Sequence, residues 1–196
     1  MKLRLAACAL ALFASGCASL PEPGVPEDWP ARRAALQALD GWSLHGRIAV
    51  AAGEDGFSGG FDWSQQGANA DIEVSGPMGG KLMDIRVEGG ESVVSAGGST
   101  DANDDARKIL DEHFGPGRSL PINEMRYWLV GAPAPGSAHE ESLGEDRRLA
   151  SLSQSGWQVR YDRYQPVGEL ALPARMEMTT EGLRLRVAIS DWRLSP

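Results

Sequence analysis

The chain has 196 residues, of which 42% are hydrophobic, and a formal net charge of −8 from 27 acidic and 19 basic side chains. This acidic balance argues against nucleic acid as a partner and against charge-driven adsorption onto anionic lipid headgroups, because both need clustered Lys and Arg. A chain of this length and hydrophobicity can build the core of one ordinary domain.

The first 17 residues have the three parts of a bacterial lipoprotein signal peptide. Lys2 and Arg4 supply positive charge, residues 5–13 are apolar, and small residues precede Cys17. The apolar run is shorter than a helix needs to cross roughly 30 Å of hydrocarbon. We therefore expect residues 1–16 to be cleaved and Cys17 to be acylated. An ordinary secretory signal followed by a chance cysteine is the alternative.

Cleavage would have two consequences for the mature chain. It would remove Cys8 and leave Cys17 as the only cysteine, so that no intramolecular disulfide could form. It would also remove two positive charges, which leaves 17 basic against 27 acidic residues and a net charge of −10. Ala18 and Ser19 stand where an aspartate would favour the inner membrane, so we expect attachment to the outer membrane.

Residues 17–27 are rich in proline and lack apolar periodicity, which predicts an extended tether. We expect residues 28–196 to form a single domain. Its first element is predicted to be a short helix that begins with Asp28 as N-cap and ends near Leu39, with Leu36 and Leu39 on the buried side.

From residue 41 the period of the apolar residues changes from helical to two, which is the period of a strand. The alternation recurs in residues 44–50, 57–63, 70–74 and 83–87, with short turns carrying Gly, Asn or Asp between them. These spacings predict an antiparallel meander.

The meander is interrupted between residues 103 and 131. Apolar residues recur there at helical spacing, around residues 106–110 and again in residues 122–129. We expect two short helices, followed by an irregular and mobile connection over residues 132–144.

The rest of the chain returns to strand periodicity, in residues 157–161, 176–178 and 183–189. An antiparallel sheet with one apolar face needs a cover, and the interrupting helices are the segments available to provide it. The predicted fold is mainly β with α: an incomplete, open antiparallel β-barrel with a helical lid that encloses an apolar cavity.

Residues 56–60 fit the letters of the G-x-S-x-G nucleophile elbow, with Ser58 as the serine. That motif needs a turn from a strand into a helix, whereas this segment leads into the alternating run that ends at Trp63. The start of a hairpin strand explains the glycines better than a serine hydrolase does. No other pattern makes a positive case for catalysis, so we expect no enzymatic activity.

We also expect neither a metal site nor a cofactor. The three histidines lie far apart in the sequence and form no zinc-binding cluster. Asp101, Asn103, Asp105 and Glu112 have the spacing of a calcium loop, but Ala106 stands where the turn of that loop requires glycine. An acidic cap at the start of the predicted helix is the better explanation.

The turn at residues 76–80 carries an apolar side chain, Met78, directly after Pro77, where a turn usually carries polar residues. Glycines on both sides leave room for the methionine to be exposed. A methionine folded back onto the sheet is the commoner arrangement on the physics of the sequence alone, and an exposed methionine is the alternative.

Seven short motifs that cover nearly the whole mature chain, together with Trp42, resemble the LolB family of outer-membrane lipoprotein receptors in Gram-negative bacteria. Each motif alone is weak, whereas their order, their spacing and the lipoprotein signal make the match specific. The motifs are GRIAV (46–50), FDWSQ (61–65), GPMG (76–79), LPI (120–122), WLVG (128–131), GWQVRY (156–161) and DW (191–192).

The resemblance implies a cavity that takes the acyl chains of lipoproteins handed over by the periplasmic carrier LolA. It also implies that an apolar residue of a protruding loop, here Met78 after Pro77, inserts the cargo into the outer membrane; the family commonly has leucine there. The implied cavity lies on the apolar face of the sheet and under the lid. The alternative for each candidate is a place in a dry, packed core. The candidate lining residues are Ile48, Val50, Phe61, Trp63, Ile72, Val74, Ile85, Val87, Trp128 and Leu129.

The implied partners are a LolA-like carrier, acylated lipoprotein cargo and outer-membrane phospholipid. The protein itself would be a monomer, anchored by lipid in the outer membrane and facing the periplasm. A non-enzymatic envelope scaffold lipoprotein without lipid cargo is the alternative function, and a filled core in place of a cavity would favour it.

Overall fold

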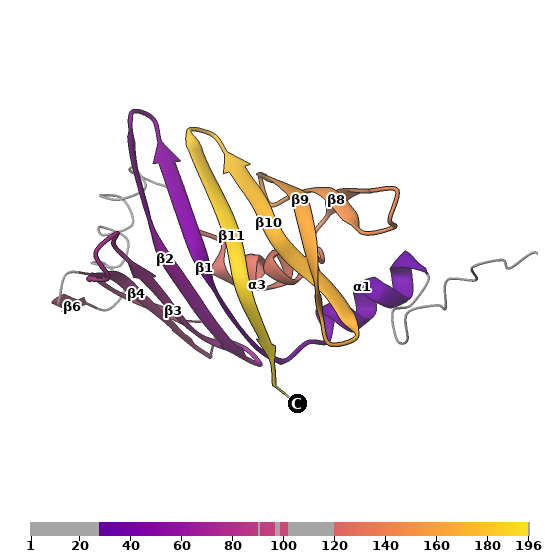
Figure 1. Ribbon diagram of the computed structural model, residues 1–196, viewed down its shortest axis with the longest axis horizontal. Coiled ribbons are helices and arrows are strands. Elements are labelled where there is room, and N and C mark those ends of the chain that lie inside the picture. The colour runs from indigo at the N-terminus through magenta and orange to yellow at the C-terminus, as the bar shows by residue number, and fades with distance from the viewer. Residues whose placement is uncertain (1–27, 90, 97–98, 102–119, 196) are drawn as a thin grey trace, which may run out of the picture.

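The computed structural model describes residues 28–89, 91–96, 99–101 and 120–195. In this part of the chain, eleven strands form one sheet in the order β6-β5-β4-β3-β2-β1-β11-β10-β9-β8-β7, accompanied by the helices α1 (Trp29–Gln37) and α3 (Ile122–Val130) (Figure 1). The strands are β1 (Gly41–Ala52), β2 (Asp55–Gln66), β3 (Asn69–Ser75), β4 (Lys81–Glu88), β5 (Glu91–Ala96), β6 (Ser99–Asp101), β7 (His139–Leu143), β8 (Leu149–Gln154), β9 (Trp157–Val167), β10 (Leu170–Thr180) and β11 (Leu183–Leu194).

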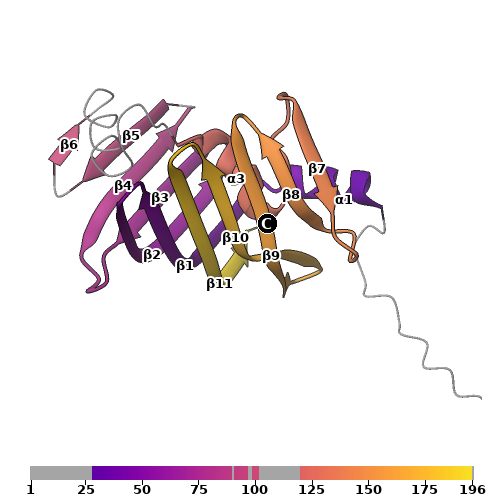
Figure 2. The same ribbon diagram turned by 90° about the horizontal axis from the view of Figure 1, so that it is seen from above.

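Two antiparallel meanders make up the sheet and meet at its centre. Strands β1 to β6 pair in sequence order, as do β7 to β11, and β1 pairs with β11 to join the two halves. Within the described residues, the edge strands β6 and β7 do not pair with each other, so the curved sheet stays open (Figure 2). The predicted mainly β fold, an open antiparallel sheet with helices, is confirmed.

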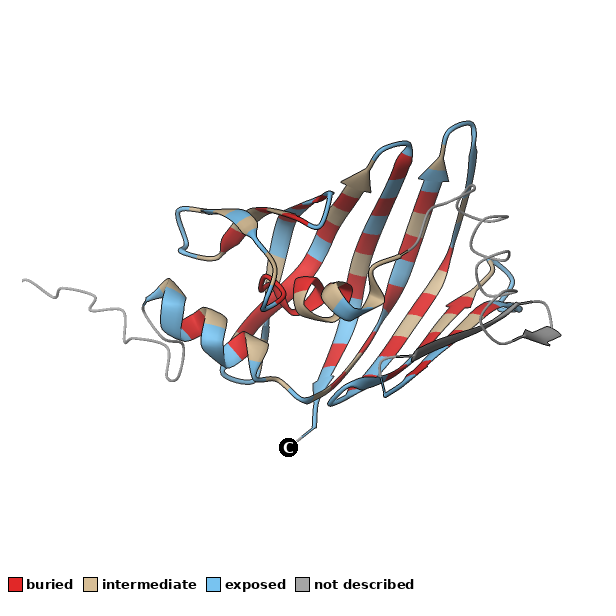
Figure 3. Ribbon diagram, turned by 180° about the vertical axis from the view of Figure 1, so that it is seen from behind, coloured by how far each residue is buried: buried red, intermediate tan, exposed pale blue. Residues whose placement is uncertain are grey.

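Buried and exposed side chains alternate along the strands, as the banding in Figure 3 shows. In β1, the side chains of Trp42, Leu44, Ile48 and Val50 are buried, whereas most of the residues between them are half-buried or exposed. Because strand side chains point to opposite faces in turn, one face of the sheet is apolar and the other is polar. The period-two runs of the sequence are therefore strands, as predicted.

The prediction of an irregular connection over residues 132–144 is confirmed for residues 132–138 but was wrong for residues 139–143, which form β7 and pair with β8. Four of the five residues of β7, HEESL, are polar, which hides the strand period, and an edge strand needs little apolar area. Strand β8 was also missed. Its buried apolar residues, Leu149 and Leu152, are three apart and break the period of two.

Helix α1 carries Pro30 in its first turn, where the missing N–H would have no helical partner anyway. Asp28 occupies the N-cap position but makes no side-chain capping hydrogen bond, contrary to the prediction. The helix is held by the buried guanidinium of Arg32, which donates to the carbonyl of Ala171 in β10 at 2.6 Å. The helix predicted around residues 106–110 lies outside the described residues.

Helix α3 lies across the inner, apolar face of the sheet (Figure 3). It ends at Gly131, whose φ of +87° is the left-handed conformation that glycine adopts without strain. The indole N–H of Trp128 donates to Gln154 Oε1 in β8 at 2.8 Å. The same amide accepts from the backbone N–H of Ala134 at 2.9 Å and donates to the Ala134 carbonyl at 2.8 Å. One buried glutamine thus ties α3 and its following loop to the sheet.

Replacing Gln154 by leucine keeps the approximate size of the side chain but removes its polar atoms. The indole of Trp128 and the backbone of Ala134 would lose buried partners, at about 1–3 kcal/mol for each unsatisfied group. Three groups lose their partner, so we expect Gln154→Leu to lower the free energy of unfolding, measured by urea titration, by about 3 kcal/mol or more. Gln158→Leu, at an exposed position of β9, should change it by less than about 0.5 kcal/mol. Equal losses in the two variants would contradict this role of the buried amide.

Candidate functional site: the inner face and the 76–80 loop

The inner face of the sheet brings together all ten residues that the sequence predicts to line an acyl-chain cavity. Eight come from β1 to β4 and two from α3, and they belong to one hydrophobic cluster. None of them exposes more than 6% of its surface. The ten residues are Ile48, Val50, Phe61, Trp63, Ile72, Val74, Ile85, Val87, Trp128 and Leu129.

The same cluster extends further than the sequence prediction of the cavity. Met176 and Met178 from β10 have no exposed surface, and Met83 from β4 and Met125 from α3 join them in the cluster. The alternation that marked β10 as a strand was the signal available for including its methionines. Methionine is unbranched and flexible, so four of them make this face easier to deform than one built from branched side chains.

Aromatic rings form one end of the inner face. Trp42 stacks on Trp63 with ring centroids 5.9 Å apart and meets Trp192 edge-on at 5.3 Å. Phe61 contacts Trp63 edge-on at 6.2 Å. Trp42 and Trp192, from the paired strands β1 and β11, therefore form one aromatic group with the predicted cavity residue Trp63. The indole N–H of Trp192 donates to the carbonyl of Pro173 at 3.0 Å.

Two polar groups that reach this face are hydrogen-bonded and neutral. The indole N–H of Trp63 donates to Gln65 Oε1 at 2.8 Å, and the hydroxyl of Tyr161 donates to the carbonyl of Trp128 at 2.9 Å. Burial raises the pKa of Tyr161 well above its usual range, so its hydroxyl stays protonated. These groups add hydrogen bonds to the inner face without adding charge.

The raised pKa of Tyr161 makes stability depend on pH in the alkaline range. Below about pH 10 the hydroxyl is neutral in both the folded and the unfolded chain, and the full stability is present. Above that pH the unfolded chain ionises first, so stability falls as pH rises. We expect urea titrations to show wild type losing up to about 1.4 kcal/mol more per pH unit than Tyr161→Phe above pH 10. Parallel pH slopes in the two proteins would contradict the burial of this hydroxyl.

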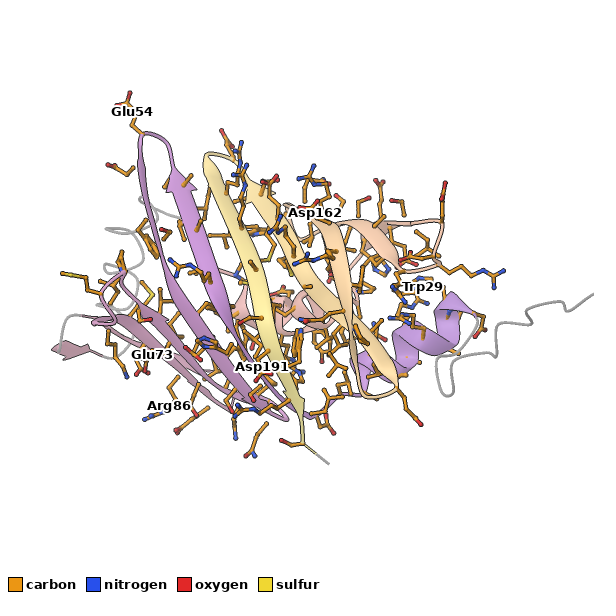
Figure 4. The ribbon with its side chains drawn as sticks, viewed as in Figure 1. Trp29, Glu54, Glu73, Arg86, Asp162 and Asp191 are labelled. Atoms are coloured by element: carbon orange, nitrogen blue, oxygen red, sulfur yellow. The ribbon has the colours of Figure 1, made fainter. Side chains whose placement is uncertain are left out.

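The outer face carries two shallow grooves, of about 580 and 460 Å³, and both are lined by charged residues. In the larger groove, Arg86 pairs with Asp71 at 2.9 Å and Arg193 pairs with Asp191 at 3.2 Å. Figure 4 shows Arg86 and Asp191 on this face, on β4 and β11. The paired charges of the larger groove suit water better than hydrocarbon, and the smaller groove combines apolar residues with six charged side chains. The apolar inner face, whose hydrophobic cluster contains no charged side chain among the described residues, is therefore the candidate for lipid.

The loop between β3 and β4 carries Met78 at its tip, and its side chain is 100% exposed. The methionine therefore does not fold back onto the sheet. The N–H of Gly76 donates to the carbonyl of Gly80 at 2.7 Å, and the N–H of Gly79 donates to the carbonyl of Gly76 at 3.0 Å. These bonds close a β-turn that has Pro77 at its second position, where its fixed φ is favourable.

Below the loop, Lys81 joins the two strands that carry it. Its Nζ lies 2.8 Å from Glu73 Oε2 in β3 and 2.5 Å from Asp84 Oδ2 in β4. The hydrogen bonds to Asp84 and to Glu73 raise the pKa of the Lys81 ammonium above its usual range. The group is exposed, so its contribution to stability is small. It bridges the two strands just below the loop.

Leu82 is an exposed apolar side chain beside the loop that the sequence analysis did not single out. It is 36% exposed, and a Cβ placed on Gly76 would lie 3.6 Å from its Cγ. Leu82 breaks the alternation of β4, where Met83 is the inward residue, and this irregularity was the only signal of its position.

Other predicted features have different outcomes. Cys17 and the tether lie outside the described residues, as does most of the segment with calcium-loop spacing. Where the structure is described, no group of three or more His, Cys, Asp or Glu side chains is placed to hold a metal ion, and no helix has the length and apolar character to cross a membrane. Ser58 lies within β2 opposite Ala49 and not at a strand-to-helix turn.

The family profile described as Outer membrane lipoprotein LolB matches residues 40–192. The chain belongs to the LolB family. The Outer-membrane lipoprotein LolB of Pseudomonas aeruginosa is 34% identical over 200 residues, which cover 98% of this chain and 96% of that protein. The protein of the same name from Pseudomonas putida is 33% identical over 192 residues, covering 94% of this chain and 92% of that protein.

Solved structures show the same fold at low sequence identity. A LolA-superfamily protein from Nitrosomonas europaea has a TM-score of 0.52 at 12% identity and covers 84% of this chain and 94% of its own. A DUF1329 family protein from Desulfovibrio piger has a TM-score of 0.59 at 8% identity and covers 84% of this chain and 90% of its own. The open sheet of this LolB protein is thus shared with the LolA superfamily.

LolB proteins are outer-membrane lipoproteins by name, and membership of the family confirms the localisation predicted from the amino-terminal segment. The protein is held in the outer membrane by a lipid anchor and faces the periplasm.

Proposed function

We propose that this LolB protein takes lipoproteins from a LolA-like periplasmic carrier, holds their acyl chains against the inner face of the sheet and inserts them into the outer membrane. It acts as a monomer and without catalysis. The observation that carries the proposal is the combination of one continuous apolar face in an open sheet with a fully exposed methionine on a protruding loop.

Acyl chains need such a face because each exposed CH₂ costs about 0.8 kcal/mol in water. The inner side chains bury one another in one hydrophobic cluster, so bound acyl chains would replace contacts that these side chains make with each other. The four buried methionines can change rotamer to allow this. The ten predicted residues, led by Ile48, Phe61 and Trp63, are proposed to line the bound chains together with Met176 and Met178.

The direction of transfer would follow from relative affinities, because the proposed steps use no nucleotide. A difference of about 1.4 kcal/mol between carrier and receptor gives a tenfold bias. The bilayer then offers the acyl chains a still better solvent than either protein. Release into the membrane therefore needs a contact that brings the receptor to the bilayer surface.

Met78 is suited to provide that contact, because it is apolar, unbranched and fully exposed. Pro77 stiffens the turn, and Leu82 adds apolar surface at its root. We propose that this tip enters the lipid interface while the acyl chains leave the inner face.

The lipid anchor would meet the membrane at a separate point. We propose that residues 1–16 are removed as a signal peptide, that Cys17 carries the acyl group and that residues 17–27 form the tether of the domain that begins at residue 28. Helix α1 follows the tether and is fixed to the β7 edge, where Trp29 Nε1 donates to Glu141 Oε1 at 2.7 Å. Figure 1 shows α1 and the β3–β4 hairpin at opposite ends of the sheet.

The central test mixes a Cys17→Ala form of the mature protein, which lacks the anchor, with a LolA-like carrier loaded with fluorescent lipoprotein. We expect the lipoprotein to move to the receptor and to co-purify with it, because the inner face shields the acyl chains. An excess of unlabelled receptor should compete. Absence of transfer between two folded proteins would refute the receptor function and leave the scaffold alternative.

A charge at the loop tip should separate capture from delivery. Met78→Asp places a carboxylate where the lipid interface is proposed to be, and we expect cargo capture to be unchanged while delivery to phospholipid vesicles falls by about tenfold or more. Met78→Leu should retain delivery. Ala68→Asp, which adds the same charge to the exposed β2–β3 turn, is the matched control. Undiminished delivery by Met78→Asp would show that this loop is not the insertion element.

A further inference from the structure

Two glycines of the G-x-S-x-G segment in β2 lie directly against the root of the 76–80 loop. A Cβ built on Gly59 would lie 1.8 Å from the carbonyl oxygen of Ser75 and 2.9 Å from its carbonyl carbon. A Cβ on Gly60 would lie 2.4 Å from Ser75 Oγ. Neither contact is possible between real atoms, so side chains at these positions would require Ser75 to move.

The two clashes differ in kind. At Gly59 the obstacle is the backbone of residue 75, which cannot move without shifting the chain that enters the loop. At Gly60 the obstacle is a hydroxyl, which can rotate away or be removed by substitution. The next atom of Ser75 is its own Cβ, which would lie 3.7 Å from a Cβ placed on Gly60, an ordinary van der Waals distance.

Ser75 is also the point at which the loop leaves the sheet. The pairing of β2 with β3 ends at the pair Gly60–Ser75. On the other side, the register of β3 with β4 shifts between Val74 and Ser75, so that Ser75 stands opposite Lys81. The direction in which the loop projects is therefore set at Ser75, where β2, β3 and β4 meet.

The loop has little of its own to fix that direction. Three of its five residues are glycines, and around Gly79 and Gly80 no atom would lie within 4 Å of an added Cβ. Glycine has the largest backbone freedom of any residue, so the closing hydrogen bonds hold the shape of the turn without holding its angle to the sheet. Close packing of the Ser75 backbone on Gly59 supplies that constraint.

We propose that Gly59, together with Gly60, leaves the space in which the root of the 76–80 loop packs against β2. This packing positions the loop so that Met78 projects from the sheet toward the membrane. The inference rests on the proposed role of Met78 in delivery. It assigns to the G-x-S-x-G segment a function as a positioning element, and it makes Gly59 a positioning residue that itself contacts neither cargo nor lipid.

The test compares single alanine substitutions in the mature, acylated protein. We expect Gly59→Ala to retain cargo capture and to lose delivery to phospholipid vesicles by about tenfold, because the loop root is displaced. Amide hydrogen exchange at Gly76 and Gly79 should become about tenfold faster, since the bonds that close the turn are strained. Gly80→Ala adds a Cβ in open space within the same loop and should change neither readout.

The substitution Ser75→Ala distinguishes the contribution of Gly59 from that of Gly60. Gly60→Ala alone should reduce delivery and amide protection less than Gly59→Ala does. The double substitution Gly60→Ala/Ser75→Ala should restore both to the level of Ser75→Ala alone, because the clashing hydroxyl is gone. Gly59→Ala/Ser75→Ala should remain as impaired as Gly59→Ala, because the carbonyl of residue 75 is still present.

The outcomes separate this proposal from the one on which it rests. Normal delivery and normal amide exchange in Gly59→Ala would refute the positioning role of Gly59 even if Met78→Asp blocks delivery. Normal delivery by Met78→Asp would refute the role of Met78 in delivery, while amide exchange would still test whether Gly59 positions the loop. If Gly59→Ala misfolds and loses cargo capture, the test rests on comparing delivery and amide exchange between Gly60→Ala and Gly60→Ala/Ser75→Ala. Failure of Ser75→Ala to rescue would then overturn the proposal.

Discussion

The pairing of the first strand with the last is the constraint on which the rest of this structure depends. Strands β1 and β11 run antiparallel from the pair Trp42–Leu194 to the pair Ala52–Leu183, with one register shift between His45 and Gly46. Without this ladder the chain would form two separate meanders, each with a narrow apolar face. With it, the two faces merge into one inner surface, on which α3 is held by the buried amide of Gln154.

A deformable face and a loop whose direction is fixed at its root divide the proposed work between them. The inner face is rich in methionine, and under the proposed function its contacts are exchanged for those of acyl chains of different length. The loop has the opposite character, because its turn is closed by backbone hydrogen bonds, its strands are bridged by Lys81 and its root packs on Gly59. A flexible binding surface tolerates varied cargo, whereas a tip that contacts the membrane must keep its direction under load.

Much of the fold follows from sequence pattern, and the exceptions have identifiable physical causes. Period-two runs predict the strands that have one buried face, and the glycines and proline around Met78 allow an exposed tip. Strand β7 was missed because an edge strand can be polar on both faces. The pairing of β1 with β11 joins segments about 140 residues apart, and no local pattern encodes that partner. The place of Gly59 likewise depends on Ser75, which only the folded sheet brings against it.

The acidic side chains of β7 affect how this edge of the sheet can interact with other chains. This edge strand exposes backbone amides and carbonyls with which another extended chain could pair. The strand carries Glu140 and Glu141. The carboxylate of Glu141 accepts hydrogen bonds from Trp29 and Arg33 of α1. Charged edge strands resist edge-to-edge stacking. The charges of β7 therefore protect this edge of the sheet against pairing with a second copy of the chain.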